Sequence, residues 1–108
     1  MRLANKSSVF DQLVDRSGTI TSGGTSQQLM PKNADRFYLF FQNISTGDEW
    51  LNHTTAAQIG VAGNIRVRPG ETFAMEGSYL TGESWNIIGA TTGQAFTSKE
   101  NSPSPGNI

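Results

Sequence analysis

The chain has 108 residues, of which 35% are hydrophobic and 16% charged, with eight Lys and Arg against nine Asp and Glu. This length suits one domain with a modest core. A net charge of −1 with no basic block argues against electrostatic binding to nucleic acid or to an anionic membrane. The absence of cysteine excludes disulfides and thiolate metal sites.

The first 16 residues differ in pattern from the rest of the chain. Residues 8–15 form the one candidate helix, because Phe10, Leu13 and Val14 fall near helical spacing behind a serine that can cap the first turn. A helix this short is marginal alone. We therefore expect residues 1–16 to be an arm that orders against another subunit. No apolar stretch follows the basic start, so we predict no signal peptide, and no segment is long enough to span a bilayer.

Short strand signals recur after residue 17. Residues 36–44 are apolar and aromatic on both faces, which is typical of a central strand covered on each side. Other segments alternate between apolar and polar residues and are separated by Gly, Pro and Asn turns. About eight short antiparallel strands at regular spacing favour a β-sandwich or jelly-roll-like fold. The predicted strands are residues 18–21, 27–30, 36–44, 49–52, 64–68, 72–76, 84–90 and 94–97.

Alternation also predicts the core and one change of direction. A tight turn at Pro69-Gly70 would place Phe73 beside arginines rather than beside Val67. Keeping both apolar residues inward requires a longer loop, or a corner where the chain changes sheets, as sandwiches and jelly rolls use. The residues expected to point inward are Phe37, Leu39, Phe41, Ile65, Val67, Phe73, Met75, Trp85 and Ile87.

These boundaries give three parts. Residues 1–16 are the arm, residues 17–98 are the β body, and residues 99–108 are a flexible tail that contains two prolines and a glycine.

The sequence offers little for catalysis, so we do not expect an enzyme. His53 is the only histidine, too few for the metal sites of jelly-roll enzymes, and we expect it to be a surface residue at a strand end. No serine lies in a nucleophile elbow. Asp48 and Glu49 are a possible cation pair, but adjacent carboxylates in a turn are usually solvated. We predict no catalytic residue, no metal and no cofactor.

Other motifs have ordinary explanations. Asn5, Asn43 and Asn52 each begin a glycosylation sequon, a match that chance produces often in a chain rich in Asn, Ser and Thr. Trp50 and Trp85 lie in apolar strands, which favours packing in the core or at an interface over a sugar-binding platform. Tyr79, in the loop between residues 77 and 82, is the best candidate for an exposed aromatic side chain.

Several segments together resemble small virion proteins of tailed phages. They are the run from Ser17 to Asn43, the Trp50-Leu-Asn52 strand, the Arg68-Pro-Gly-Glu71 turn and the run from Trp85 to Gly93. The resemblance covers about residues 16 to 98. It is greatest for capsid decoration, or cement, proteins with a jelly-roll-like body. It brings no functional residue with it.

The resemblance implies a structural role on the outer surface of a virion assembled in the host cytoplasm. The expected partners are the major capsid protein and further copies of the chain, as a dimer or trimer, without nucleic acid or membrane. We predict that Phe10, Leu13, Val14 and Tyr79 lie at interfaces. The alternative is a tail or fibre module that binds a host surface glycan or another tail protein.

Overall fold

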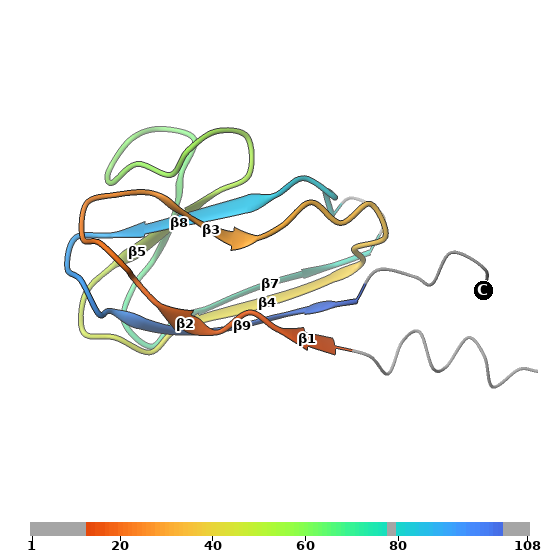
Figure 1. Ribbon diagram of the computed structural model, residues 1–108, viewed down its shortest axis with the longest axis horizontal. Coiled ribbons are helices and arrows are strands. Elements are labelled where there is room, and N and C mark those ends of the chain that lie inside the picture. The colour runs from red at the N-terminus through yellow and green to blue at the C-terminus, as the bar shows by residue number, and fades with distance from the viewer. Residues whose placement is uncertain (1–12, 78–79, 103–108) are drawn as a thin grey trace, which may run out of the picture.

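The computed structural model describes residues 13–77 and 80–102, and within these residues every regular element is a β-strand (Figure 1). Each of the eight predicted strands coincides with an observed one, and a ninth precedes them. The predicted all-β class is therefore confirmed. The strands are β1 (Leu13–Asp15), β2 (Gly18–Thr19), β3 (Gln27–Met30), β4 (Tyr38–Asn43), β5 (Glu49–Asn52), β6 (Ile65–Val67), β7 (Thr72–Glu76), β8 (Trp85–Gly89) and β9 (Ala95–Asn101).

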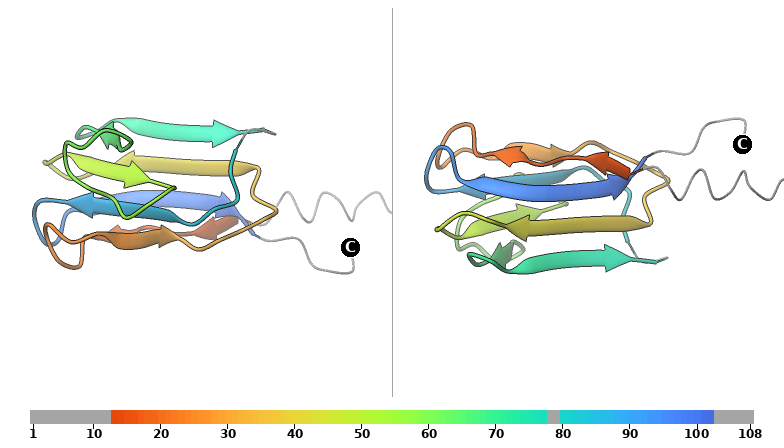
Figure 2. Two further views of the ribbon diagram at one scale, coloured as in Figure 1. Left: turned by 90° about the horizontal axis from the view of Figure 1, so that it is seen from above. Right: turned by 90° about the horizontal axis from the view of Figure 1, so that it is seen from below.

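The strands form two antiparallel sheets packed face to face. Sheet A has the order β1-β9-β4-β7, with β2 also paired to β9, and sheet B has the order β3-β8-β5-β6. Strand β5 pairs with β6, β4 with β7, β3 with β8 and β2 with β9, so the chain is a long hairpin ribbon whose successive pairs alternate between the sheets. This arrangement is a jelly roll. Figure 2 shows β6 and β7 at one edge of the sandwich and β1 and β3 at the other.

The corner after β6 explains the apolar pattern noted in the sequence. Strand β6 belongs to sheet B and β7 to sheet A, so the chain changes sheets between Val67 and Thr72. A turn makes this change, in which the Glu71 amide donates to the Arg68 carbonyl at 3.0 Å and Gly70 has a φ of 82°. Glycine adopts this left-handed conformation without a steric penalty. The predicted corner is confirmed.

The ends of the body differ from the expected boundaries. The predicted helix is wrong over residues 13–15, because Leu13 to Asp15 pair as β1 with Asn101 to Lys99 of β9. The sandwich therefore extends past both ends of residues 17–98, since β9 also continues to Asn101. Residues 13–15 lie at the edge of sheet A beside the long strand β9. Pairing with β9 satisfies their backbone N–H and C=O groups, whereas a segment this short would not form a stable helix alone.

The core between the sheets contains most of the residues expected there. Leu39, Phe41, Val67, Trp85 and Ile87 are almost fully buried. Three further predicted residues are only partly buried, and all three come from the edge strands β6 and β7; they are Ile65, Phe73 and Met75. Phe37, just before β4, is also only partly buried. The core is thus closed in the middle of the sandwich and less completely covered along one edge.

A buried carboxylate joins the loops at the end of the sandwich where the described chain begins and ends. Glu100 of β9 is fully buried and accepts hydrogen bonds from Arg36 Nε at 2.8 Å and from Arg16 Nε at 2.9 Å. The Asn33 amide also donates to it, at 3.1 Å. The Arg36 guanidinium, equally buried, donates to three carbonyls of the 31–36 and 80–84 connections. One acid therefore fixes β9, the entry into β2 and two loops.

Replacing this acid with its amide tests its contribution. The substitution Glu100→Gln keeps the shape but leaves Arg36 buried without a counter-charge, and removing one partner of a buried ion pair costs about 3–5 kcal/mol of the free energy of unfolding. The neighbouring Lys99 is exposed, so Lys99→Gln should change that free energy by less than about 0.5 kcal/mol. Urea denaturation measures both. Equal, small effects of the two substitutions would contradict the role given to Glu100.

Candidate interaction surfaces

The outer face of sheet B is covered by the chain itself. The connection between β5 and β6, residues 53–64, folds back over it, as Figure 1 shows above β8 and β5. The side-chain amide of Asn86 donates to the Thr55 carbonyl at 2.9 Å, and the backbone amide of Ala57 donates to Ser26 Oγ at 2.9 Å. Beneath the connection, Ile88 points away from the core yet is only 5% exposed. We call residues 53–64 the cover loop.

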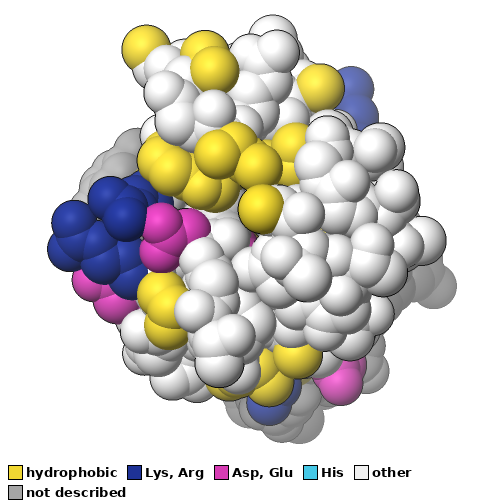
Figure 3. Space-filling model, turned by 90° about the vertical axis from the view of Figure 1, so that its left-hand side faces the viewer, with side chains coloured by type: hydrophobic (Ala, Val, Ile, Leu, Met, Phe, Trp, Pro, Cys, Tyr) yellow, Lys and Arg dark blue, Asp and Glu magenta, His cyan; other side chains and the backbone are white. Residues whose placement is uncertain are grey.

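The cover loop exposes apolar side chains on its outer side. Ile59 is 43% exposed and Val61 is 45% exposed. Ile44, in the connection between β4 and β5, is 54% exposed. Figure 3 views the sandwich from the end that carries this connection, and hydrophobic side chains gather in the upper half of that view. Isolated large apolar residues between glycines were the available sequence signal for Ile59 and Val61, and our sequence interpretation treated that segment only as a loop.

The outer face of sheet A has no such cover, because no described segment crosses it (Figures 1 and 2). Its central strand β4 presents the half-buried aromatic residues Tyr38 and Phe40 outward. The paired positions on β7 are Glu76 and Ala74, both exposed. A hollow of ≈ 390 Å³ lies among Tyr38, Met75 and these two residues. We call this surface the sheet A face.

The predicted interface residues fall into two groups. Leu13, the first residue of β1, is 51% exposed and points to the sheet A face, whereas the neighbouring Val14 is partly buried and pairs with Glu100. Phe10 and Tyr79 lie outside the described residues. The structure therefore offers Leu13 for contacts and gives Val14 a place in the sandwich.

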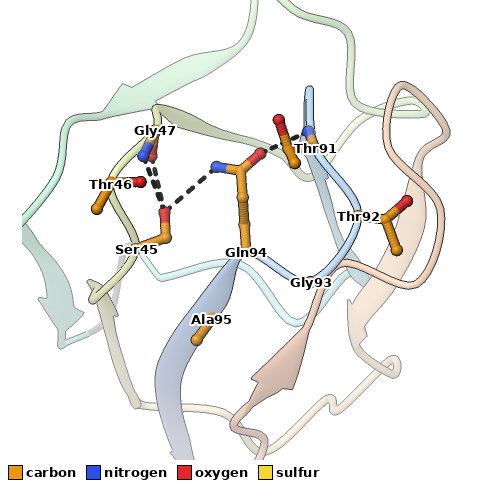
Figure 4. Close-up of a pocket in the computed structure, with 8 residues that line it drawn as sticks. All are labelled: Ser45, Thr46, Gly47, Thr91, Thr92, Gly93, Gln94 and Ala95. Atoms are coloured by element: carbon orange, nitrogen blue, oxygen red, sulfur yellow. Dashed lines mark hydrogen bonds between the residues drawn. The ribbon is translucent and has the colours of Figure 1, made fainter.

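A polar hollow lies between the β4–β5 and β8–β9 connections. It measures ≈ 540 Å³ and is lined by residues 45–47 and 91–95 (Figure 4). The side chain of Gln94 spans its base, accepting from the Thr91 amide at 2.8 Å and donating to Ser45 Oγ at 3.3 Å and to the Asp48 carbonyl at 3.1 Å. The amide of Gln94 thus connects two loops and has no spare group that faces a ligand.

The adjacent acids next to this hollow separate. Asp48 points outward and pairs with Arg66 at 2.7 Å. Glu49 points into the sandwich and is fully buried, so the expectation that both are solvated is wrong for Glu49. The reason is strand alternation, because Glu49 opens β5 on the same side as the core residue Leu51. Among the described residues neither carboxyl oxygen of Glu49 has a hydrogen-bond partner.

Burial raises the pKa of Glu49 to about 8, and the nearby Ser45 hydroxyl lowers it only in part. That hydroxyl has a single proton and already lies 2.7 Å from Asn43 Oδ1 and 2.9 Å from the Gly47 carbonyl. The protonated, neutral form of Glu49 is therefore favoured in the folded protein at neutral pH.

His53 is a strand-end residue, as expected. Its ring contacts Trp85 at a centroid distance of 4.7 Å, and its Nδ1 lies 3.2 Å from Glu83 Oε1. In the parts of the chain that the structure describes, no group of three or more His, Asp or Glu residues could hold a metal ion. In the same residues, no helix is long and apolar enough to cross a membrane.

The sequons at Asn43 and Asn52 have a structural function. Each asparagine ends a strand, and its Oδ1 accepts from the backbone amide and the hydroxyl of the residue two positions on, Ser45 or Thr54. Side chains of this kind close a turn in place of a backbone group. Both asparagines are buried. The Asn5 sequon lies outside the described residues.

The chain matches no protein-family model and no curated protein sequence. Among solved structures it is similar to a protein from Bacillus endospore appendages, described as a novel family of disulfide-linked pili, with 17% identity, a TM-score of 0.48 and coverage of 86% of this chain and 90% of that one. It is also similar to a cupin-2 domain containing protein from Shewanella frigidimarina, with 12% identity, a TM-score of 0.47 and coverage of 96% and 94%. At these identities the likeness concerns the fold alone.

Glu49 makes the stability of the body depend on pH. Its pKa is about 8 in the folded state against 4.5 as the ordinary value, so its contribution is complete below pH 4.5 and is lost as pH rises through 8. Between pH 5 and pH 8 the loss is on the order of 2–4 kcal/mol. The substitution Glu49→Gln should remove most of this dependence, as measured by urea denaturation across that range.

The matched control is Glu76→Gln, at an exposed position of β7. It should leave the pH dependence as it is in the unsubstituted chain. If Glu49→Gln and the control give the same slope of stability against pH, Glu49 is not the buried acid responsible.

Proposed function

We propose that this protein is a structural virion component that decorates a phage capsid and cements it by bridging neighbouring capsomers, without catalysis. The observation that carries this proposal is the presence of contact regions on opposite faces of one body. The cover loop presents Ile59 and Val61 beyond sheet B, while no described segment crosses the sheet A face, beside which lies Leu13. A bridging protein needs at least two such separate regions.

The resemblance of residues 16 to 98 to phage virion proteins supports the same role. A protein that binds only the assembled lattice stabilises that lattice by mass action. Each contact can be weak, because copies repeated by the symmetry of the shell act together. The buried Glu100–Arg36 ion pair, together with the Arg16–Glu100 pair, fixes one end of the body, and a firmly held body suits this task.

We assign the shell contact to the cover loop. Its apolar side chains are about half exposed, and burying the rest of two such side chains contributes about 1–2 kcal/mol. Hydrogen bonds to Ser26 and Asn86 hold the loop against the sheet, so the loop loses little conformational entropy when it binds.

The second candidate is a tail or fibre module that binds a host glycan. The hollow around Gln94 favours it in one respect, because the hydroxyl side chains that line it suit sugar hydroxyls. Its lining contains no aromatic ring on which a sugar could stack. We therefore rank it below decoration.

Binding to particles that lack the protein tests the proposal. The double substitution Ile59→Ser with Val61→Ser should weaken binding of the full chain to undecorated capsids about tenfold, since 1.4 kcal/mol corresponds to a factor of ten. Cosedimentation with capsids measures the affinity, and thermal unfolding checks that the body is intact.

The matched control is Gln58→Ser, an exposed position in the same loop. It should bind capsids as the unsubstituted chain does. Failure of the unsubstituted chain to bind capsids, together with binding to tails or to host glycan, would favour the second candidate and overturn the first.

A further inference from the structure

We propose that the sheet A face is the docking site for the N-terminal segment, residues 1–12, of a second copy of this chain, and that the exchange of segments is reciprocal. This inference goes beyond the proposed function, because it concerns contact between copies and is tested without particles.

The two outer faces of the sandwich differ in how far the described residues cover them. Sheet B is covered by its own loop, and its outward-facing residue Ile88 is only 5% exposed. On sheet A the equivalent outward side chains, Tyr38 and Phe40, have no such cover among the described residues. Two adjacent aromatic side chains in the middle of a sheet face form the kind of surface that proteins use for contact rather than leave to solvent.

The area of the sheet A face favours reciprocal contacts with a segment over direct stacking of two faces. The sheet A face is four strands wide and about five residues long, which gives about 350 Å² from the ordinary strand spacing and rise. Direct stacking of two such faces would bury about 700 Å² in total, no more than a crystal contact usually does. Two reciprocal contacts in which each segment covers a whole face would bury up to about 1,400 Å², which lies within the range of stable interfaces.

The segment joins the body at one end of the sheet A face. Strand β1 begins at Leu13, at the end of sheet A, with the Leu13 side chain on the sheet A face. Twelve residues upstream reach about 40 Å when extended, about twice the width of the sheet. A segment that continues the line of β1 away from the sheet would reach a neighbouring copy without the reversal that folding back over its own face requires.

Charge and apolar content match as well. The face presents Asp15, Glu76 and Lys99, a net charge of −1. The segment contains Arg2, Lys6 and Asp11, a net charge of +1. It also supplies large apolar side chains for the aromatic centre of the face, namely Leu3, Val9 and Phe10.

Sedimentation velocity over a range of concentrations tests the association. Ala74→Glu, on the face, and Phe10→Ser, in the segment, should each raise the dissociation constant of the dimer at least about tenfold in the full chain. The matched control is Gln28→Glu, an exposed outward position on sheet B, which should leave it within about twofold. A chain that is monomeric at all concentrations, or a dimer that neither substitution weakens, would overturn the proposal.

Cross-linking identifies the occupant, and the chain is suited to it because it contains no cysteine. One sample carries Ser8→Cys and another carries Ala74→Cys, and a flexible thiol-specific cross-linker is added to their mixture. The expected product is a cross-linked dimer of one copy of each kind, with far less product when Gln28→Cys replaces Ala74→Cys. If cross-linking occurs only within a chain that carries both substitutions, the segment covers its own face and the exchange is wrong.

Discussion

The body depends on one buried charge, the carboxylate of Glu100. Its two oxygens accept from Arg16, Asn33 and Arg36, and Arg36 in turn satisfies three carbonyls of the 31–36 and 80–84 connections. Each of these groups would be costly to bury without its partners. The pairing of the last strand with the first is therefore tied to the position of two loops far away in the sequence. Because that carboxylate sits where the described chain begins, Leu13 leaves from a fixed point rather than from a fraying edge.

The fixed position of Leu13 matters because, in the proposed role, the two outer faces of the body make different contacts. The cover loop gives sheet B a second layer and presents apolar residues beyond it. Within residues 13–77 and 80–102, no segment covers the outer face of sheet A. One face then suits a contact with a shell, and the other suits a contact between copies. A small body with a low apolar content can gain from both, since each partner that binds only the folded state stabilises it further.

The sequence predicted the strands because alternation and turn residues are local signals. It also predicted that Val67 and Phe73 share a face through either a longer loop or a sheet-changing corner, and the structure has the corner. It did not predict the pairing of Arg36 with Glu100, which lie 64 residues apart. Glu100 sits in a stretch whose prolines and glycine indicated a flexible tail. For Leu13 to Asp15, the helical spacing of apolar residues was outweighed by a free edge of β9.

The candidate surfaces were harder to predict than the fold. The sequence alone does not show whether a large apolar residue in a loop is buried or exposed. Only the folded structure shows that Ile59 and Val61 are exposed. Glu49 was misjudged because it was treated as part of the turn with Asp48, although alternation in the predicted strand 49–52 places it on the same side as Leu51. The local periodicity of apolar residues in a sequence does not reveal contacts that depend on long-range packing.

Electron cryomicroscopy of the intact phage particle tests the central claim most directly. We predict density of jelly-roll shape on the outer surface of the capsid, bridging capsomers, with the cover loop against the shell and the sheet A face towards a neighbouring copy. Density for the protein confined to the tail, or its absence from the particle, would contradict it.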